Sequence, residues 1–303
     1  MNKTIKPMLA VAYSDTVMQP SFSLVSEKLD GIRCIFIDGV AYSRSMKPFP
    51  NTYLQEVARE YAALDMVDCE IIVGDKYDKA VLQNSMRFCM SKGRNDEFKI
   101  YAFDLICGDE PFYSRTEYLK ERFEEHHCLP ECAEYVPHFI ISPKHMAEVE
   151  LSAYEEKIVS LGGEGVMIND GNAPYFFGRK TTKNSPPLQK LKRFQDTEAV
   201  VVGYEPLLQN NNQSVVNTLG YAERSMSKDG MIEKDALGSI VVEAFNTTFH
   251  VGSGWTIQER EELWKDRESL IGKIAKVKYF KLNQYGTPSF PTFLCWRDKL
   301  DIS

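Results

Sequence analysis

The stretch K-L-D-G-I-R, residues 28–33, constrains the fold more than any other, because it sets three charged residues where a strand ends. In an extended strand alternate side chains share a face, so Lys28 and Asp30 point the same way. Gly31 interrupts the strand, and we expect it to permit a turn that brings Arg33 round to that side. Charges are costly to bury without partners. The stretch therefore predicts a strand end bent around a charged group.

The length and composition favour a globular chain of two domains. The sequence has 303 residues, enough for two cores, and it contains no run of about 18 apolar residues, so we expect no membrane span. The N-terminus lacks the long apolar segment of a signal peptide. The seven cysteines are odd in number and scattered, which is typical of reduced thiols in a cytoplasmic protein. His126, His127, Cys128 and Cys132 match no common zinc spacing.

The net charge of −7 hides an uneven distribution of basic residues. Two stretches, 173–195 and 271–296, contain lysines and arginines but no acid, whereas acids gather between residues 104 and 134. Solvated surface lysines explain any single position. Two acid-free stretches on an acidic chain favour a groove that faces phosphates.

The first 194 residues alternate strand and helix patterns. Residues 33–43 predict a hairpin around Asp38-Gly39, and Asn51 predicts the N-cap of a helix. Residues 66–75, 99–106, 165–169 and 188–192 predict strands, and residues 115–127 predict a helix. We expect Ser152 to cap a helix that runs to Leu161 and ends at Gly162-Gly163.

From residue 195 the pattern becomes that of a small barrel. Strands are predicted at 198–206, 238–245, 247–253, 273–280 and 289–296, with a hairpin turn around Asn246-Thr247. Thr256 and Glu259 predict a capping box for a helix to about Arg267. The asparagine-rich stretch 209–235 has little core-forming content and predicts a loop. Five short strands with one helix between them are typical of an OB fold.

Lys28 is a candidate nucleophile, provided that Arg33 and the later lysines converge with it on one pocket. An amine becomes nucleophilic when burial or nearby cations lower its pKa, and Arg33 and later lysines supply cations. Attack on a nucleotide phosphate also requires charge neutralisation and carboxylates for a metal. Glu70 and Glu164 lie in otherwise apolar strands, where a carboxylate needs a partner. Lys190 and Lys192 share one strand face.

Six short motifs of the chain resemble those of a known enzyme family. K-L-D-G-I-R fits the K-x-D-G-x-R signature of covalent nucleotidyltransferases, and S-R-S-M-K (43–47), D-C-E (68–70), Y-A-F-D-L-I (101–106), E-G-V-M-I (164–168) and L-Q-K-L-K-R-F (188–194) follow in order. The combination resembles ATP-dependent DNA ligases, most closely the compact Chlorella virus type, over nearly the whole chain. The resemblance implies an α+β fold: an adenylation domain (1–194) of antiparallel sheets with flanking helices, then an OB-fold barrel (195–303).

The resemblance also implies an activity: sealing 3′-hydroxyl/5′-phosphate nicks in duplex DNA through lysyl–AMP and an adenylated DNA. ATP would be the co-substrate, Mg²⁺ the metal and nicked duplex DNA the partner of a monomeric, intracellular enzyme. Lys28 would carry AMP, with catalytic support from Asp30, Arg33, Lys190 and Lys192. The implied cofactor-binding residues are Ser26, Glu27, Arg33, Glu70, Phe103, Glu164, Lys190, Lys192 and Arg297. The implied metal ligands are Glu164, Glu70 and Asp30, and the implied DNA contacts are Arg44, Lys47, Arg179, Lys276 and Lys278.

Two features depart from the pattern of DNA ligases, and three alternative functions stay open on the sequence alone. In the last motif of these ligases, an arginine is usually followed by an acidic and a basic residue. Here Arg297 matches the arginine, and the candidates for the other two places are Asp298-Lys299 or Asp301. The segment 205–236 aligns with a DNA-embracing loop but is nearly charge-balanced, and we hypothesise that it is disordered without DNA and closes on it. The alternatives are an RNA ligase, a capping guanylyltransferase, and a non-catalytic OB-fold protein that binds nicks or single strands.

Overall fold

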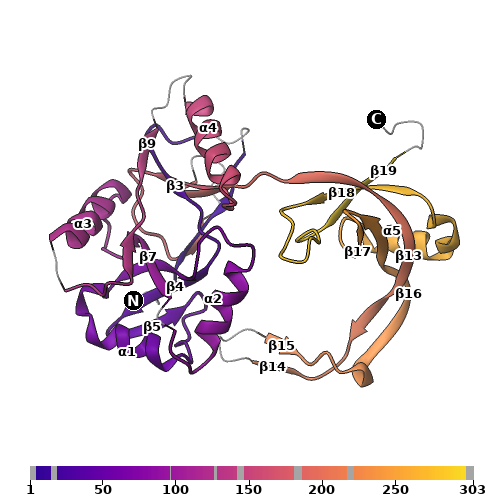
Figure 1. Ribbon diagram of the computed structural model, residues 1–303, viewed down its shortest axis with the longest axis horizontal. Helices are drawn as coiled ribbons and strands as arrows, with labels where there is room; N and C mark the ends of the chain where they lie inside the picture. The colour runs from indigo at the N-terminus through magenta and orange to yellow at the C-terminus, as the bar shows by residue number, and fades with distance from the viewer. Residues whose placement is uncertain are drawn as a thin grey trace. The chain divides into compact units, whose positions relative to one another are not determined.

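The computed structural model describes residues 5–14, 19–95, 97–125, 128–141, 147–180, 186–216 and 222–297. The chain forms two compact units (Figure 1). The first contains the residues up to Lys192, and the second contains most of the residues from Arg193 onward. No helix in the described ranges has the length and apolar character of a membrane span. All seven cysteines are free thiols.

The first unit holds two five-stranded sheets whose pairings are mostly antiparallel. One sheet has the strand order β2-β12-β10-β3-β9 and the other β5-β4-β6-β7-β8, beside a small β1-β11 pair. Its strands are β1 Met8–Leu9, β2 Val11–Ala12, β3 Ser23–Glu27, β4 Ile32–Ile37, β5 Val40–Ser43, β6 Val67–Val73, β7 Phe98–Leu105, β8 Ala133–Tyr135, β9 Phe139–Ile141, β10 Val166–Asp170, β11 Gly178–Arg179 and β12 Leu188–Leu191. Its helices are α1 Thr52–Glu60, η1 Ala62–Leu64, α2 Val81–Met90, α3 Phe112–Glu125 and α4 Ala147–Ser160.

Local sequence signals set several of these elements as predicted. Asp38 and Gly39 both have positive φ (49° and 72°), as the two central residues of a type I′ turn require, and they join β4 to β5. The Asn51 side chain accepts a hydrogen bond from the Leu54 backbone at 2.8 Å and caps α1. The apolar face of α1 then packs into the core over the β5-β4-β6-β7-β8 sheet.

The expected start of α4 is wrong. The helix begins at Ala147, so Ser152 lies inside it instead of at its N-cap. Its end is as predicted, because Gly162 adopts a positive φ of 97° just after the last turn. His126 and His127 lie outside the described residues.

The second unit is built on one five-stranded sheet with the order β17-β16-β13-β18-β19. Its buried side chains form a single apolar core in which Leu237, Ile240 and Val277 are fully enclosed. Its elements are β13 Gln195–Asn210, β14 Ser214–Val216, β15 Ala222–Arg224, η2 Lys228–Gly230, β16 Met231–Ala244, β17 Thr247–Val251, α5 Ile257–Lys265, η3 Arg267–Leu270, β18 Ile274–Tyr279 and β19 Thr292–Arg297.

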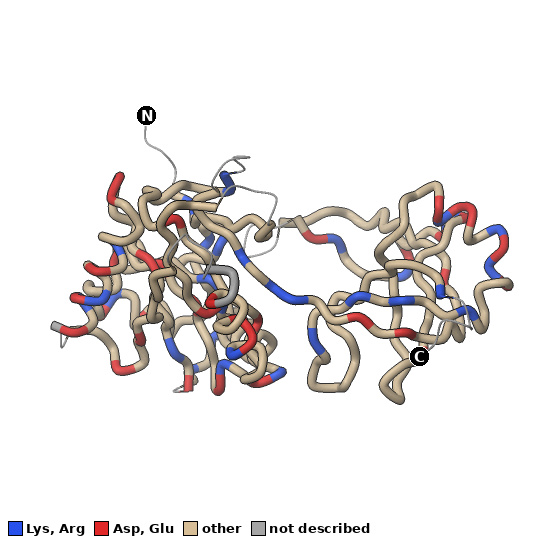
Figure 2. The backbone as a smooth tube through the Cα atoms, turned by 90° about the horizontal axis from the view of Figure 1, so that it is seen from above, with Lys and Arg blue, Asp and Glu red and all other residues tan. Residues whose placement is uncertain are grey.

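Two details of the second unit refine the sequence predictions. The capping box of Thr256 and Glu259 is present at the start of α5, as expected. The hairpin between β16 and β17 turns at Phe245 and Asn246, whose φ values are 55° and 56°, one residue earlier than expected. Figure 2 shows both kinds of charge on each unit, so the acid-free stretches lie in units that also carry acids.

The described residues of 205–236 form paired strands and a 3-10 turn instead of an irregular loop, whereas disorder of this segment without DNA stays a prediction. β13 and β16 continue as an antiparallel pair as far as Asn210 and Met231, and β14 pairs with β15 beyond them. The asparagines have a structural role there. The Asn212 side-chain amide donates to the Ser225 and Ser227 carbonyls at 2.8 and 2.9 Å, and Asn210 donates to Ser225 at 2.9 Å. Side-chain amides thus satisfy backbone groups where no core exists.

Candidate active site

Three adjacent strands bring Lys28, Glu164 and Lys192 together. In the order β12-β10-β3, Val166 of β10 pairs with Glu27 on one side and with Leu191 on the other. Lys28 follows β3, Lys192 follows β12, and Glu164 precedes β10, so all three stand at the same end of the sheet. Glu164 forms ion pairs with both lysines. The Lys28 backbone N–H also donates to the Gly165 carbonyl at 2.9 Å, which fixes its place.

Gly31 allows a close backbone approach. Lys28–Gly31 link β3 of one sheet to β4 of the other, and a Cβ at Gly31 would lie 2.5 Å from the Ile71 carbonyl oxygen of β6. The chain bends at Gly31 as expected, but its φ is not positive, so the close approach is what requires a glycine here. The link brings Lys28 to the junction of the two sheets.

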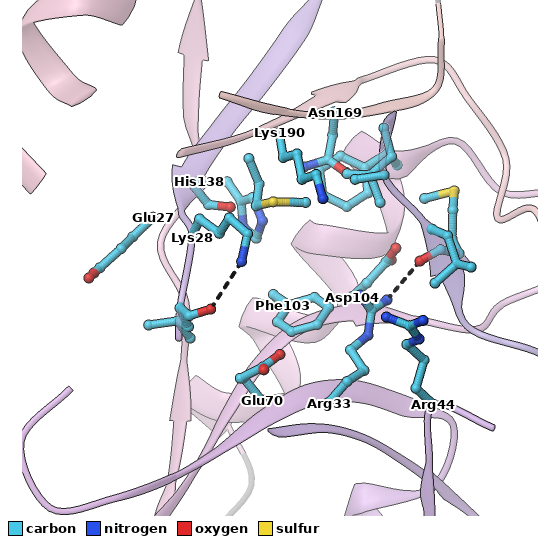
Figure 3. A pocket seen from close by; sticks show the side chains of 18 of the residues that line it. Glu27, Lys28, Arg33, Arg44, Glu70, Phe103, Asp104, His138, Asn169 and Lys190 are labelled. Carbon is cyan, nitrogen blue, oxygen red and sulfur yellow. Dashed lines mark hydrogen bonds between the residues drawn. The ribbon is translucent and has the colours of Figure 1, made fainter. Parts of the chain in front are cut away.

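At this junction lies a cavity of about 220 Å³ that both sheets line (Figure 3). Its walls contain most of the residues that the sequence singled out in the first unit: Ser26, Glu27, Lys28, Arg33, Arg44, Glu70, Phe103, Arg179 and Lys190. Lys192 and Glu164 adjoin it through their ion pairs with one another and with Lys28. Apolar walls with a few converging charges are typical of a small-ligand site.

The two lysines of the cavity are tuned toward the neutral amine. Burial lowers the pKa of Lys28, aided by the Arg33 charge and opposed by the carboxylates of Glu70 and Asp30. Burial also lowers the pKa of Lys190, together with the charges of Lys28, Arg179 and Arg44. The ion pair with Glu164 favours the charged form of the Lys28 amine and so acts in the opposite direction.

Arg33 and Phe103 form a fixed layer on one side of the cavity. The Arg33 guanidinium donates two hydrogen bonds of 2.5 Å to the fully buried Asp68 carboxylate, and one of 3.3 Å to the Met8 carbonyl. It also lies over the Phe103 ring, 4.7 Å from the centroid. The Tyr175 hydroxyl donates to Asp68 as well. One face of Phe103 is thus covered by a cation, and the ring also lines the cavity.

Glu70 and His138 contribute titratable groups of unusual pKa. Burial raises the pKa of Glu70 to about 7, although Lys28 and Arg33 oppose the shift. Burial lowers the pKa of His138 to about 4, and its ring packs edge-on against Phe112 at 5.2 Å. His138 is therefore a neutral imidazole in the cavity wall near neutral pH. Both groups can hydrogen-bond a ligand without carrying a full charge.

The remaining predicted residues of the first unit fall into different positions. Arg44 and Arg179 are exposed at the cavity rim. Glu27 is held by an ion pair to Lys76 at 2.5 Å. Lys47 is exposed in the turn after β5 and does not line the cavity.

The predicted residues of the second unit lie on β18 and β19. Arg297 pairs with Glu198 at 3.2 Å, and Lys276 pairs with Asp196 at 3.1 Å. The Lys278 ammonium lies over the Phe194 ring, 3.9 Å from its centroid. Asp298, Lys299 and Asp301 lie outside the described residues.

The predicted metal ligands do not form a set. Within the part of the chain that the structure describes, no three His, Cys, Asp or Glu side chains gather closely enough to hold a metal ion. Asp30, Glu70 and Glu164 are therefore not a three-carboxylate site. Mg²⁺ in phosphoryl-transfer sites is commonly held by one or two carboxylates with substrate phosphates. Glu164, at the centre of the lysine pair, fits that smaller role.

Asp68 and Asp104 were missed at the sequence level. Asp68 anchors Arg33, and Asp104 binds the fully buried Arg115 through hydrogen bonds of 2.8 and 3.0 Å. Each is a carboxylate inside an apolar strand, the same signal that identified Glu70 and Glu164. His138 gave no such signal, because it follows a short strand and no periodic pattern contains it.

Comparisons with known proteins agree with this geometry. The model of the ATP dependent DNA ligase domain matches residues 7–192, and the model of the DNA ligase OB-like domain matches residues 232–297. A DNA ligase of Haemophilus influenzae is 24% identical over 279 residues, covering 91% of this chain and 86% of the relative. Among solved structures, one from a study of Lig E DNA ligases has a TM-score of 0.72 at 22% identity and covers 97% of this chain and all of that one. A Chlorella virus DNA ligase–adenylate has a TM-score of 0.52 at 28% identity, covering 97% and 99%.

These matches decide among the alternatives that the sequence left open. The family models are those of DNA ligases, instead of RNA ligases or capping enzymes, and the first covers more than half of the chain. The binding-only alternative is excluded with them, and the predicted α+β fold is confirmed. The chain belongs to the ATP-dependent DNA ligases, enzymes that seal nicks by forming phosphodiester bonds.

Proposed function

We propose that Lys28 is the residue that carries AMP in this ligase, and that the cavity around it binds ATP. The observation that supports this most is the position of Lys28. It stands at the junction of two sheets with a lowered pKa, beside Glu164 and among Arg33, Lys190 and Lys192. A partly desolvated amine surrounded by fixed cations is suited to attack a phosphate.

The reaction divides into three transfers of a phosphoryl group. The neutral Lys28 Nζ attacks the α-phosphorus of ATP, a P–N bond forms, and the bond to pyrophosphate breaks. An oxygen of the 5′-phosphate at the nick then attacks the same phosphorus and the P–N bond breaks. Finally the 3′-hydroxyl attacks the 5′-phosphate and AMP leaves. Lys190 and Lys192 stabilise the charge that develops on the α-phosphate.

The cavity walls suggest how the nucleotide is held. Adenine stacks on the face of Phe103 that Arg33 leaves open, and Ser26, Glu27 and Glu70 bind polar atoms of the nucleoside. Glu70 binds the ribose as a hydrogen-bond acceptor or donor according to its charge. Arg44 and Arg179, exposed at the rim, contact the 5′-phosphate of the nick. Arg33 positions Phe103 through its bonds to Asp68.

Mg²⁺ would be held by Glu164 together with the phosphates, and would supply neutralisation of phosphate charge. Glu164 must then exchange its lysine partners for the metal. The negative charges of Glu70 and Asp30 raise the pKa of Lys28. The chain's own cations would share the task of charge neutralisation.

The second unit provides the further contacts with nicked duplex DNA. Lys276, Lys278 and the long β13–β16 ribbon bind the backbone of the duplex, and Arg297 orients the pyrophosphate of ATP. The ribbon carries few net charges, so most of the salt dependence of binding comes from the basic stretches 173–195 and 271–296. The enzyme acts as an intracellular monomer.

Nick sealing tests the proposal directly. Wild type should seal a labelled nicked duplex in the presence of ATP and Mg²⁺, and Lys28→Ala should not. Lys28→Ala should still seal a nick whose 5′-phosphate already carries AMP, because the third step needs no amine; this shows that the variant is folded. Lys99→Ala, which removes an exposed lysine, is the matched control. Sealing of an unmodified nick by Lys28→Ala would overturn the proposal.

A further inference from the structure

The first unit contains a second cavity beside the proposed ATP site. It has a volume of about 620 Å³, within the range of small-ligand sites. Its walls include Lys6, Tyr175, Phe176, Phe177, Arg179 and Lys180. We call it the Phe177 pocket. Arg179 lines both cavities, so the two lie next to each other.

The charges of the Phe177 pocket are those of an anion site. Lys6, Arg179 and Lys180 face a single acid, Asp109. All three cations are exposed, and none of them forms an ion pair with another residue of the described ranges. Three cations that no carboxylate of the described residues pairs with attract a phosphate backbone.

The apolar wall adds a second, independent requirement. The Phe177 ring is 37% exposed and stands edge-on to Tyr175 at 5.9 Å, while the Lys180 ammonium lies over Phe176 at 3.6 Å. Tyr175 is itself fixed, because its hydroxyl bonds Asp68 and the Met8 backbone. A rigid aromatic surface beside exposed cations suits a group that is apolar on one side and anionic on the other. A deoxyribose with its phosphate has this character.

We propose that the Phe177 pocket binds the sugar and the 3′-phosphate of the first nucleotide on the strand whose 5′-phosphate is sealed. This rests on the proposed function, which brings that 5′-phosphate to Arg179. Lys180 and Lys6 bind the phosphate, and Phe177 packs on the deoxyribose. The pocket thereby aligns the 5′-phosphate with Lys28-bound AMP.

The test removes one charge from the protein and one from the DNA. The DNA carries a neutral methylphosphonate between the first and second nucleotides of the 5′-phosphate strand. Lys180→Ala and this DNA should each lower the rate of sealing by adenylated enzyme at subsaturating DNA by about five- to tenfold, the scale of one lost phosphate contact. Combined, they should lower it no further than either alone. Phe177→Ala should lower the rate on both DNAs.

The controls separate this inference from the proposed function. Lys120→Ala, which removes an exposed lysine of α3, should act independently of the methylphosphonate. Reaction of Lys28 with ATP should be normal in Lys180→Ala and Phe177→Ala, since neither residue lines the ATP cavity. Multiplying effects of Lys180→Ala and the methylphosphonate, or normal sealing by both variants, would overturn the inference while leaving the role of Lys28 intact.

Discussion

At the scale of single residues, the site works by placing charges where water is scarce. Glu164 lies between Lys28 and Lys192, Asp68 holds Arg33, and Glu70 faces Lys28 inside the cavity. Each carboxylate forms an ion pair with a cation or lies close to one, as buried charges require. The result is a lysine whose pKa is lowered by burial and whose neighbours include cations suited to bind a phosphate.

Glu70 makes stability depend on pH. An acid whose folded-state pKa lies above its ordinary value binds its proton more tightly in the native state. Burial raises the pKa of Glu70 from 4.5 to about 7. Protonation of Glu70 therefore stabilises the native state at low pH, and this stabilisation is lost as the pH rises from 4.5 through about 7. Relative to Glu70→Gln, wild type should become less stable by about 3 kcal/mol between pH 4.5 and pH 8. Urea unfolding at both pH values measures this, and an unchanged gap between the two proteins would contradict it.

Phe103 should control the affinity for ATP. Phe103→Ala removes the stacking surface, and we expect the KM for ATP in lysine adenylation to rise about tenfold, the scale of one lost base stack. Phe103→Tyr keeps the ring and serves as the control. Arg33 should stay in place in both variants because Asp68 holds it by two hydrogen bonds. Equal KM values for wild type and Phe103→Ala would show that adenine binds elsewhere.

At the scale of elements, the strand ends create the site, and the sequence revealed much of this. The motifs fall at the ends of β3, β10 and β12 because functional side chains need strand backbones to position them. Local signals such as Asp38-Gly39 and Asn51 located a hairpin and a helix start correctly. They are visible in the sequence because each acts within four residues.

Other features could not be predicted because they depend on distant partners. The asparagine-rich strands of the ribbon lack an apolar alternation, and only cross-strand pairing makes them strands. Asp104 and His138 acquire their roles from Arg115 and Phe112, which come from other elements. The start of α4 also could not be predicted from Ser152. A serine has a high preference for the N-cap position, but Ser152 lies inside the helix, which begins at Ala147.

Gly31 is the tightest point between the two sheets of the first unit. A Cβ at this position would lie 2.5 Å from the Ile71 carbonyl and 2.7 Å from an Ile72 side-chain carbon, so β6 would have to move. We expect Gly31→Ala to lower the free energy of unfolding by about 1–3 kcal/mol, as overpacking does. Gly93→Ala is the matched control, since its nearest neighbour is a serine hydroxyl at 3.9 Å. Equal denaturation midpoints for the two variants would contradict the close approach.

At the scale of the whole molecule, the cavity around Lys28 and the ribbon proposed to bind the duplex lie in separate units of the chain. The ATP cavity belongs wholly to the first unit, and the β13–β16 ribbon belongs to the second. This division predicts that DNA affinity can be reduced while the reaction with ATP stays normal.

Shortening the ribbon tests that division. Asn210 and Met231 face each other in the ladder, so a two-residue Asn-Gly turn can replace residues 211–230. The shortened protein should react with ATP at the wild-type rate but bind a nicked duplex about tenfold more weakly, a loss of about 1.4 kcal/mol. Arg224→Ala in the intact ribbon gives the contribution of one charge. Unchanged affinity in the shortened protein would show that residues 211–230 do not bind DNA.

The central claim is that Lys28 becomes covalently adenylated, and peptide mass spectrometry after incubation with ATP and Mg²⁺ tests it most directly. The account predicts that the peptide containing Lys28 gains the mass of one AMP through an acid-labile, alkali-stable bond, and loses it when nicked duplex is added. AMP on any other residue, or none on a protein that seals nicks, would contradict the account.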